Sequence, residues 1–427
     1  MDRRLRLGLG GGLVALGLVL GGVAHAADAD QDKPKTRVTQ VLSHETYQQM
    51  QKAQEKFDAK DYKGAEGELD KLKDGYKKLN DYEKATLWNL YAAVYRSEND
   101  NKKAVEAYNN LLQQKNLPQA LRDNALFSLA QTYFLEEDYQ SAIRELKRWV
   151  SLVETPQPDA YILMAQAYYQ MNQFDAAKEP ILDAMRIAKL EGKPYNENWL
   201  SLLRAVYYET KDYKSAAKVL EVLASQYPQK GTYLMQLSGM YGLLGDQKLQ
   251  TEYMHVAYVN GLITSTGDIL NMARLYMAQN APQRAVDVIR DLMKKDKAAA
   301  SDVKNIELLA QALSLARDTK ESVPVLVDLA GKTGKSQDYV YLAQAYGELA
   351  QWDDAAAAYR KALDGKEVSN PADIQMQIGT VLYNSNKLEE ARAAFVAAAQ
   401  SPKQKDSAGN WVKFVDAELE RRKAMGG

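Results

Sequence analysis

The sequence predicts an all-α protein, built as an α-solenoid of about ten helix pairs with a C-terminal capping helix. Three observations support this fold class. A spacing of small residues and tyrosine recurs about every 36 residues, the segments between turns have helical periodicity without strand signals, and turn residues or prolines separate them. Because each pair buries its apolar face only against its neighbours, the 427 residues are expected to form an array rather than separate globular domains.

The repeated pattern is a small residue, here called the centre, a tyrosine three residues later, and a second small residue nine residues after the tyrosine. The five complete copies are Ala92/Tyr95/Ala104, Ala130/Tyr133/Ala142, Ala165/Tyr168/Ala177, Ala273/Tyr276/Ala285 and Ala343/Tyr346/Ala355. Degenerate copies have their centres at Ala53, Arg204, Ser238, Ala310 and Gly379, which makes ten repeats. The first and last centres are 326 residues apart. This pattern resembles the helix–turn–helix signature of tetratricopeptide repeats, whose period is about 34 residues.

The resemblance to tetratricopeptide repeats implies a binding solenoid. The recurring tyrosines are expected to have a packing role, because of their position in the repeat. Seven of the ten repeats place tyrosine three residues after the centre. At that position a buried ring can contact neighbouring helices while its hydroxyl reaches a polar partner. These tyrosines are Tyr95, Tyr133, Tyr168, Tyr207, Tyr241, Tyr276 and Tyr346.

The N-terminus has the composition of a secretory signal. A basic segment with three arginines precedes an apolar stretch at 7–23, and an Ala-x-Ala site occupies 24–26. We therefore expect a signal peptide at 1–26, cleaved after Ala26, and a flexible leader at 27–39. The alternative is a retained membrane anchor, for which the apolar stretch is short. The chain has no cysteine, so disulfides and a lipid anchor on cysteine are excluded, and the predicted location is the periplasm.

The array is expected to have an N-terminal part at 40–238 and a C-terminal part at 239–404, followed by the capping helix and tail at 405–427. The division falls in the sixth repeat, where Gln250 replaces the second small residue and glycines cluster. These glycines are Gly239, Gly242 and Gly245. Either the helices approach closely there, or the array has a hinge, which is the preferred interpretation.

The residues do not suggest catalysis or a cofactor. After cleavage only His44 and His255 remain, they are far apart in sequence, and cysteine is absent, so no metal-ligand spacing is formed. Phosphate-loop and serine-elbow motifs are also missing. A formal net charge of −1 does not favour nucleic acid or an anionic membrane surface. We expect no enzyme activity and no cofactor.

A candidate peptide-binding groove follows from the repeat register. In tetratricopeptide arrays the first helix of each unit lines a groove, with exposed positions six and three before the centre and one and four after it. In repeats two to five these positions are rich in amide and aromatic side chains. The candidate residues are Asn89, Asn124, Phe127, Gln131, Phe134, Gln166, Tyr169, Asn198 and Tyr208. Arg96, Ile162 and Ser201 belong to the same register.

This chemistry suits an extended peptide segment of a protein partner. Amides both donate and accept hydrogen bonds, and rings offer apolar area. The alternative is that these side chains only cover helix faces.

Three stretches are more specific than the repeat itself: 79–91, 197–208 and 236–241. Among them, Glu197-Asn198-Trp199-Leu200 runs into Leu203-Arg204-Ala205-Val206-Tyr207-Tyr208. Together they resemble the periplasmic tetratricopeptide repeat protein that accompanies TonB–ExbB–ExbD energy-transduction systems. The resemblance implies an accessory scaffold for energised outer-membrane transport, with no membrane span after signal cleavage. A general cell-envelope adaptor for outer-membrane protein or polysaccharide export is the alternative.

Overall fold

The computed structural model describes residues 41–425. The signal peptide and leader expected at 1–39 lie outside the described residues. Within the described range the chain is helical, without strands, and has one isolated bridge between Lys335 and Lys366. The helices are α1 (His44–Asp58), α2 (Tyr62–Asp74), η1 (Tyr76–Lys78), α3 (Asp81–Ser97), α4 (Asn101–Leu112), α5 (Gln119–Leu135), α6 (Tyr139–Leu152), α7 (Pro158–Gln170), α8 (Phe174–Leu190), α9 (Glu197–Glu209), α10 (Tyr213–Gln226), α11 (Gly231–Leu243), α12 (Gln247–Val259), α13 (Thr266–Ala278), α14 (Pro282–Lys295), α15 (Lys297–Ser301), α16 (Val303–Leu315), α17 (Thr319–Thr333), α18 (Ser336–Glu348), α19 (Trp352–Leu363), α20 (Pro371–Asn384), α21 (Leu388–Ala398) and α22 (Lys405–Ala424).

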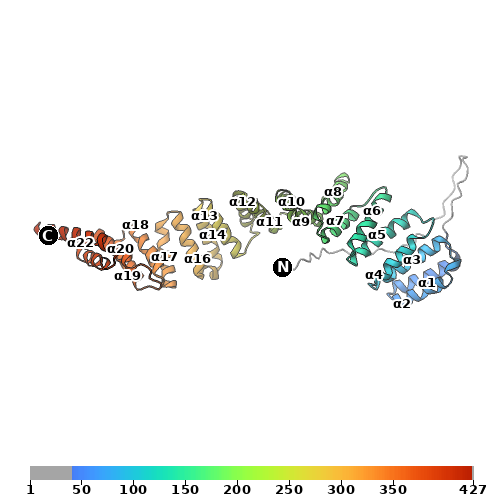
Figure 1. The fold of residues 1–427 in the computed structure, drawn as a ribbon, viewed down its shortest axis with the longest axis horizontal. Helices are drawn as coiled ribbons and strands as arrows, with labels where there is room; N and C mark the ends of the chain where they lie inside the picture. Colours follow the sequence, from blue (N-terminus) through green and yellow to red (C-terminus); the bar gives the residue numbers. More distant parts are fainter. Residues whose placement is uncertain (1–40, 426–427) are drawn as a thin grey trace. The chain divides into compact units, whose positions relative to one another are not determined.

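These helices follow one another as ten pairs, one for each repeat of the sequence (Figure 1). Every centre lies in the first helix of its pair, and every second small position lies in the second helix. The short helix α15 is an insertion before the eighth pair, which the sequence did not indicate. After the tenth pair, α22 contacts α21, and Trp411 stacks on Phe395 with ring centroids 5.1 Å apart. The predicted all-α array of about ten pairs with a capping helix is confirmed.

The alanines of the pattern lie where helices cross at close range. Both alanines in each of the five complete repeats are fully buried, at 0% exposure. The tenth repeat has glycine at its centre for a related reason. A Cβ on Gly379 would lie 2.5 Å from the ring of Phe395, so that ring occupies the space of the missing methyl group. The small residues are therefore required by packing.

The turn inside each pair has a fixed backbone geometry. The residue seven positions after the centre has a positive φ, between 55° and 76°, in all ten repeats. These residues are Lys60, Asn99, Glu137, Asn172, Lys211, Gly245, Asn280, Arg317, Ala350 and Asn386. In six repeats an aspartate follows, and its carboxylate accepts a backbone N–H of the second helix at 3.0–3.3 Å. The sequence placed turns here but did not reveal their left-handed residue.

Ala350 provides a test of this geometry, because its Cβ is unfavourable at a φ of 55°. We expect Ala350→Gly to raise the free energy of unfolding by about 0.5–1 kcal/mol, after the entropy that glycine adds to the unfolded chain. Ala357, which is exposed within α19, is the matched control, and Ala357→Gly should lower stability by about 1 kcal/mol. Urea unfolding followed by circular dichroism measures both. Destabilisation by both variants would contradict the assigned turn.

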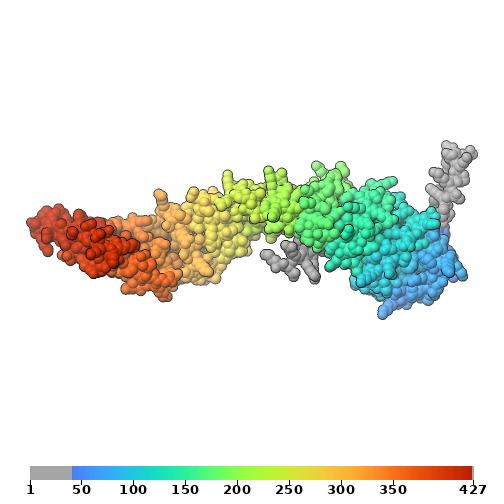
Figure 2. All heavy atoms as spheres, in the orientation of Figure 1, coloured from blue at the N-terminus to red at the C-terminus, as the bar shows by residue number. Residues whose placement is uncertain are grey.

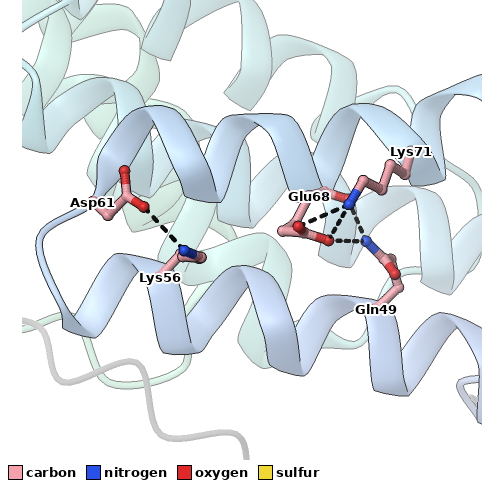
Figure 3. A network of polar contacts seen from close by, with 5 residues as sticks. All are labelled: Gln49, Lys56, Asp61, Glu68 and Lys71. Carbon is pink, nitrogen blue, oxygen red and sulfur yellow. Dashed lines mark hydrogen bonds and ion pairs between the residues drawn. The ribbon is translucent and has the colours of Figure 1, made fainter.

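The first pair illustrates how polar side chains link paired helices at the surface (Figure 3). Gln49 of α1 donates to Glu68 of α2 at 2.6 Å, and Lys71 forms an ion pair with the same carboxylate at 2.8 Å. Lys56 lies 3.3 Å from Asp61, the residue that caps α2. Such exposed ion pairs contribute little stability. The apolar contacts and the buried tyrosines between helices therefore carry the fold.

The chain divides into two compact units, an N-terminal unit that ends at Leu223 and a C-terminal unit that begins at Ala224. On the face seen in Figure 2, helix pairs of the N-terminal unit form a continuous packed surface. Of Gly239, Gly242 and Gly245, only Gly242 faces a close neighbour, since a Cβ there would lie 3.0 Å from the Gln250 amide. The division of the array at 238/239 and the hinge stay predictions.

Candidate functional site

The first helices of neighbouring repeats lie next to one another in the N-terminal unit. Helix α1 contacts α3, α5 contacts α7, and α7 contacts α9. The solvent-facing side chains of α3, α5, α7 and α9 are called the first-helix surface below. All nine candidate residues lie on these four helices, as the register predicts.

Five amide side chains belong to the first-helix surface. Asn124 and Asn198 are exposed, and Asn89, Gln131 and Gln166 are half-buried. Within the described part of the chain, the side chains of Asn124, Gln131 and Gln166 have no hydrogen-bond partner. They are therefore free to donate to, and accept from, the backbone of a bound segment.

The aromatic candidates have a second role that the sequence did not reveal. Phe127 packs on Trp149 of α6, with ring centroids 5.4 Å apart. Three others form a ring pair with the first residue of the second helix in the same repeat. The ring pairs are Phe134/Tyr139 at 5.2 Å, Tyr169/Phe174 at 5.1 Å and Tyr208/Tyr213 at 5.8 Å. These rings are held rigidly by packing and keep only part of their area open, and Tyr208 is the most open of them, at 43% exposure.

The expected exposure of one residue in this register is wrong. Ile162 is only 8% exposed, because α7 lies between the two first helices that it contacts, α5 and α9. At this position the neighbouring helices cover the side chain. Arg96 and Ser201, from the same register, are half-buried.

A shallow cavity of about 430 Å³, largely open to solvent, lies beside the first-helix surface, between repeats four and five. It is lined by the turn and first residues of α8 at 172–176, and by Glu209 and Thr210 at the end of α9. The ring of Phe174 forms part of the wall, next to its pair partner Tyr169. The sequence did not indicate this hollow, because it depends on how the turn of one repeat meets the helix end of the next.

The turns along this edge are acidic. Six carboxylate side chains are exposed at the turns of repeats three to five, against two exposed lysines, Lys211 and Lys214. The carboxylates belong to Glu136, Glu137, Asp138, Asp175, Glu209 and Asp212. Hydrogen bonds from Ser215 hold the pKa of Asp212 below its usual value. The edge is therefore negative at neutral pH.

The described residues contain no group of three histidine, aspartate or glutamate side chains that could hold a metal ion. His255 instead forms a hydrogen bond of 2.7 Å with the hydroxyl of Tyr276. Across residues 41–425, no helix combines the length and the apolar character needed to span a membrane. The absence of enzyme activity stays a prediction.

Comparisons with known proteins agree with the repeat pattern. Residues 158–189 and 202–230 match models of the tetratricopeptide repeat family. No curated protein matched the sequence.

Three solved structures are similar to parts of this chain. The first, Naa15/Naa10 bound to HypK-THB, is 15% identical to this chain, with a TM-score of 0.44. The match covers 78% of this chain and 54% of that one. The second is YrrB, described as a TPR protein with an unusual peptide-binding site, at 14% identity and a TM-score of 0.35, covering 44% and 90% of the two chains. The third is a tetratricopeptide repeat protein from Parabacteroides merdae, at 16% identity and a TM-score of 0.31, covering 60% and 98%. Residues 158–189 and 202–230 are therefore tetratricopeptide repeats, within a described chain that forms ten helix pairs.

Proposed function

We propose that the protein is a non-enzymatic periplasmic scaffold that binds extended segments of protein partners on the first-helix surface. In this proposal it serves TonB-type energised transport across the outer membrane. Tetratricopeptide repeats are protein-interaction modules, so the scaffold role follows from the repeats themselves. The periplasmic location and the TonB association rest on the sequence features at 1–26 and on the three resembling stretches.

The observation that carries the binding role is the row of unpaired amides beside half-buried rings on α5 and α7. A peptide in an extended conformation offers a donor and an acceptor at each residue, which amide side chains can satisfy together. Each such hydrogen bond contributes about 0.5–1.5 kcal/mol net. With some ring burial, and after the cost of ordering the peptide, a few contacts give affinities of roughly micromolar strength.

A pull-down from periplasmic extract, with the purified protein as bait, tests the partner class. Recovery of TonB, ExbB or ExbD would support the TonB role. Recovery of secretion or polysaccharide-synthase components in their place would contradict it and favour the envelope-adaptor alternative.

The binding surface itself is tested by amides that have no packing role. We expect the combined change of Asn124, Gln131 and Gln166 to alanine to weaken binding of the captured partner by about 10- to 2000-fold, from three lost hydrogen bonds. The melting temperature should change little, because these side chains have no hydrogen-bond partner among residues 41–425. Isothermal titration calorimetry with the purified partner gives the affinity.

The matched control uses exposed glutamines one residue after the centre in repeats eight and nine. Gln311→Ala with Gln344→Ala changes the same residue type at the same repeat position, outside the first-helix surface of repeats two to five. Equal losses of affinity in both variants would show that the surface is misassigned.

A further inference from the structure

The ring pairs form a series along the edge of repeats three to five. In each pair, the ring four residues after the centre packs against the ring nine residues after the same centre. The planes of the two rings meet at an angle of 55–68°. Repeat two interrupts the series, because Arg96 and Asn101 occupy these positions. Repeat one has an isolated pair, Phe57/Tyr62, with centroids 5.6 Å apart. Three consecutive repeats thus present the same rigid aromatic feature.

The distance between repeats restricts the conformation of a ligand that touches every ring pair. Helices α5, α7 and α9 are in contact in succession, and packed helices lie about 8–10 Å apart. A β-strand repeats its side chains on one face every two residues, at about 7 Å. A polyproline II helix repeats every three residues, at about 9 Å. The polyproline II spacing therefore matches the spacing of packed helices better than a β-strand does.

The chemistry between the ring pairs also fits proline. The cavity of about 430 Å³ lies between the second and third pairs, with Phe174 in its wall, and has room for a pyrrolidine ring. Asn172 and Gln173 line the same cavity. A polyproline II backbone has no internal hydrogen bonds, so its carbonyls can accept from such amides. Grooves lined by aromatic rings are a recurring way to bind this helix.

The charge of the edge indicates which residues accompany the prolines of such a ligand. The six exposed carboxylates of this edge face solvent around the ring pairs and outnumber its two exposed lysines, Lys211 and Lys214. Asp175 and Glu209 line the cavity itself. A ligand with lysine or arginine beside its prolines complements this surface, and an acidic ligand is repelled.

We infer that the ring-pair edge of repeats three to five binds a basic, proline-rich segment of a protein partner in the polyproline II conformation. This inference rests on the proposed scaffold function and names its partner class.

The test uses fluorescence anisotropy with the full protein and three labelled peptides of equal length. The probe is a peptide of repeated Lys-Pro-Pro triplets. Repeated Lys-Gly-Ser keeps the charge without the polyproline II helix, and repeated Glu-Pro-Pro keeps the helix with opposite charge. We expect Lys-Pro-Pro to bind at least about 10-fold more tightly than either control, with affinity that falls as salt rises. Equal binding of Lys-Gly-Ser would overturn the polyproline II part, and equal binding of Glu-Pro-Pro would overturn the charge part.

Variants then locate the binding site. Tyr208→Ala should weaken Lys-Pro-Pro binding by about 10-fold or more, whereas Tyr208→Phe should retain it, because the ring and not the hydroxyl makes the contact. Glu209→Gln, at an exposed position, should weaken binding and reduce its salt dependence. Phe57→Ala is the matched control, since it removes a ring of the same geometry outside the series. A loss with Phe57→Ala as large as with Tyr208→Ala would contradict the assignment.

The inference and the scaffold function can fail separately. If the pull-down partner binds and depends on Asn124, Gln131 and Gln166, while Lys-Pro-Pro does not bind, only the inference is overturned. If neither partner nor peptide binds, the scaffold function fails as well.

Discussion

Replacing Tyr91 with alanine is expected to lower the free energy of unfolding of the N-terminal unit by about 3–5 kcal/mol. The side chain is fully buried at 0% exposure, and its hydroxyl donates to Asp70 at 2.5 Å. Its ring stacks on the ring of Tyr95, and the ring centroids of Tyr91 and Trp88 are 5.4 Å apart. Alanine would leave a cavity between α2 and α3 and a carboxylate without its donor.

Two further variants separate the contributions at this position. Tyr91→Phe keeps the ring and should cost about 1–3 kcal/mol, since only the hydrogen bond to a charged group is lost. Tyr341, at 49% exposure, is the matched control, and Tyr341→Ala should have a small effect. Urea unfolding followed by circular dichroism and tryptophan fluorescence measures each variant. A cost for Tyr91→Ala no larger than that for Tyr341→Ala would refute the packing role.

Replacing Glu83 with glutamine is expected to cost about 2–4 kcal/mol, because two charge-assisted hydrogen bonds weaken together. The carboxylate is 4% exposed and accepts the backbone N–H of Ser43 at 2.8 Å and that of Asn80 at 2.9 Å. It thereby joins the starts of α1 and α3. Hydrogen exchange should show α1 opening in the variant before the rest of the N-terminal unit.

Glu83 also makes the fold sensitive to acid. Burial raises the pKa of its carboxyl, but the hydrogen bonds from Ser43 and Asn80 outweigh burial and the pKa lies below its usual value. The stabilisation is therefore complete above the unfolded pKa of about 4.3 and is lost as pH falls through the lowered value. The free energy of unfolding of the unchanged protein should decrease as pH drops below about 4.3, and it should decrease less in Glu83→Gln. Glu106→Gln, at an exposed position of α4, should leave this decrease unchanged.

The sequence predicted the repeats well because their cause is local. Each helix pair needs a small buried residue at a fixed position, so alanine recurs at a fixed spacing in the sequence whatever residues it contacts. The tyrosine prediction holds fully for Tyr95 and Tyr276, which are buried and bonded to Glu66 at 2.9 Å and His255 at 2.7 Å. The five other tyrosines in that position are half-buried. Tyr91 was missed, because it lies one residue before the centre and its partner Asp70 belongs to the previous repeat.

The candidate site could be predicted only in part. The register placed the amides and rings on the correct helices, since helical spacing alone decides which side of a helix they occupy. It could not show that Phe134, Tyr169 and Tyr208 already pack against a second ring. That contact depends on the left-handed turn between the two helices. Asn172 is a residue type that favours this conformation, but Glu137 and Lys211 at the other two turns are not, so the residue types do not signal the geometry consistently.

The repeated turn has a consequence for how the chain reaches its fold. Each helix contacts mainly the helices next to it in sequence, and even the bond from Ser43 to Glu83 spans only 40 residues. Contact order is therefore low, and little loop-closure entropy opposes the first native contacts. Any pair with a complete turn and buried alanines can serve as a nucleus, from which order spreads to adjacent pairs. A destabilising substitution in one helix pair should then slow the spread of folding past that pair. The other pairs should still fold.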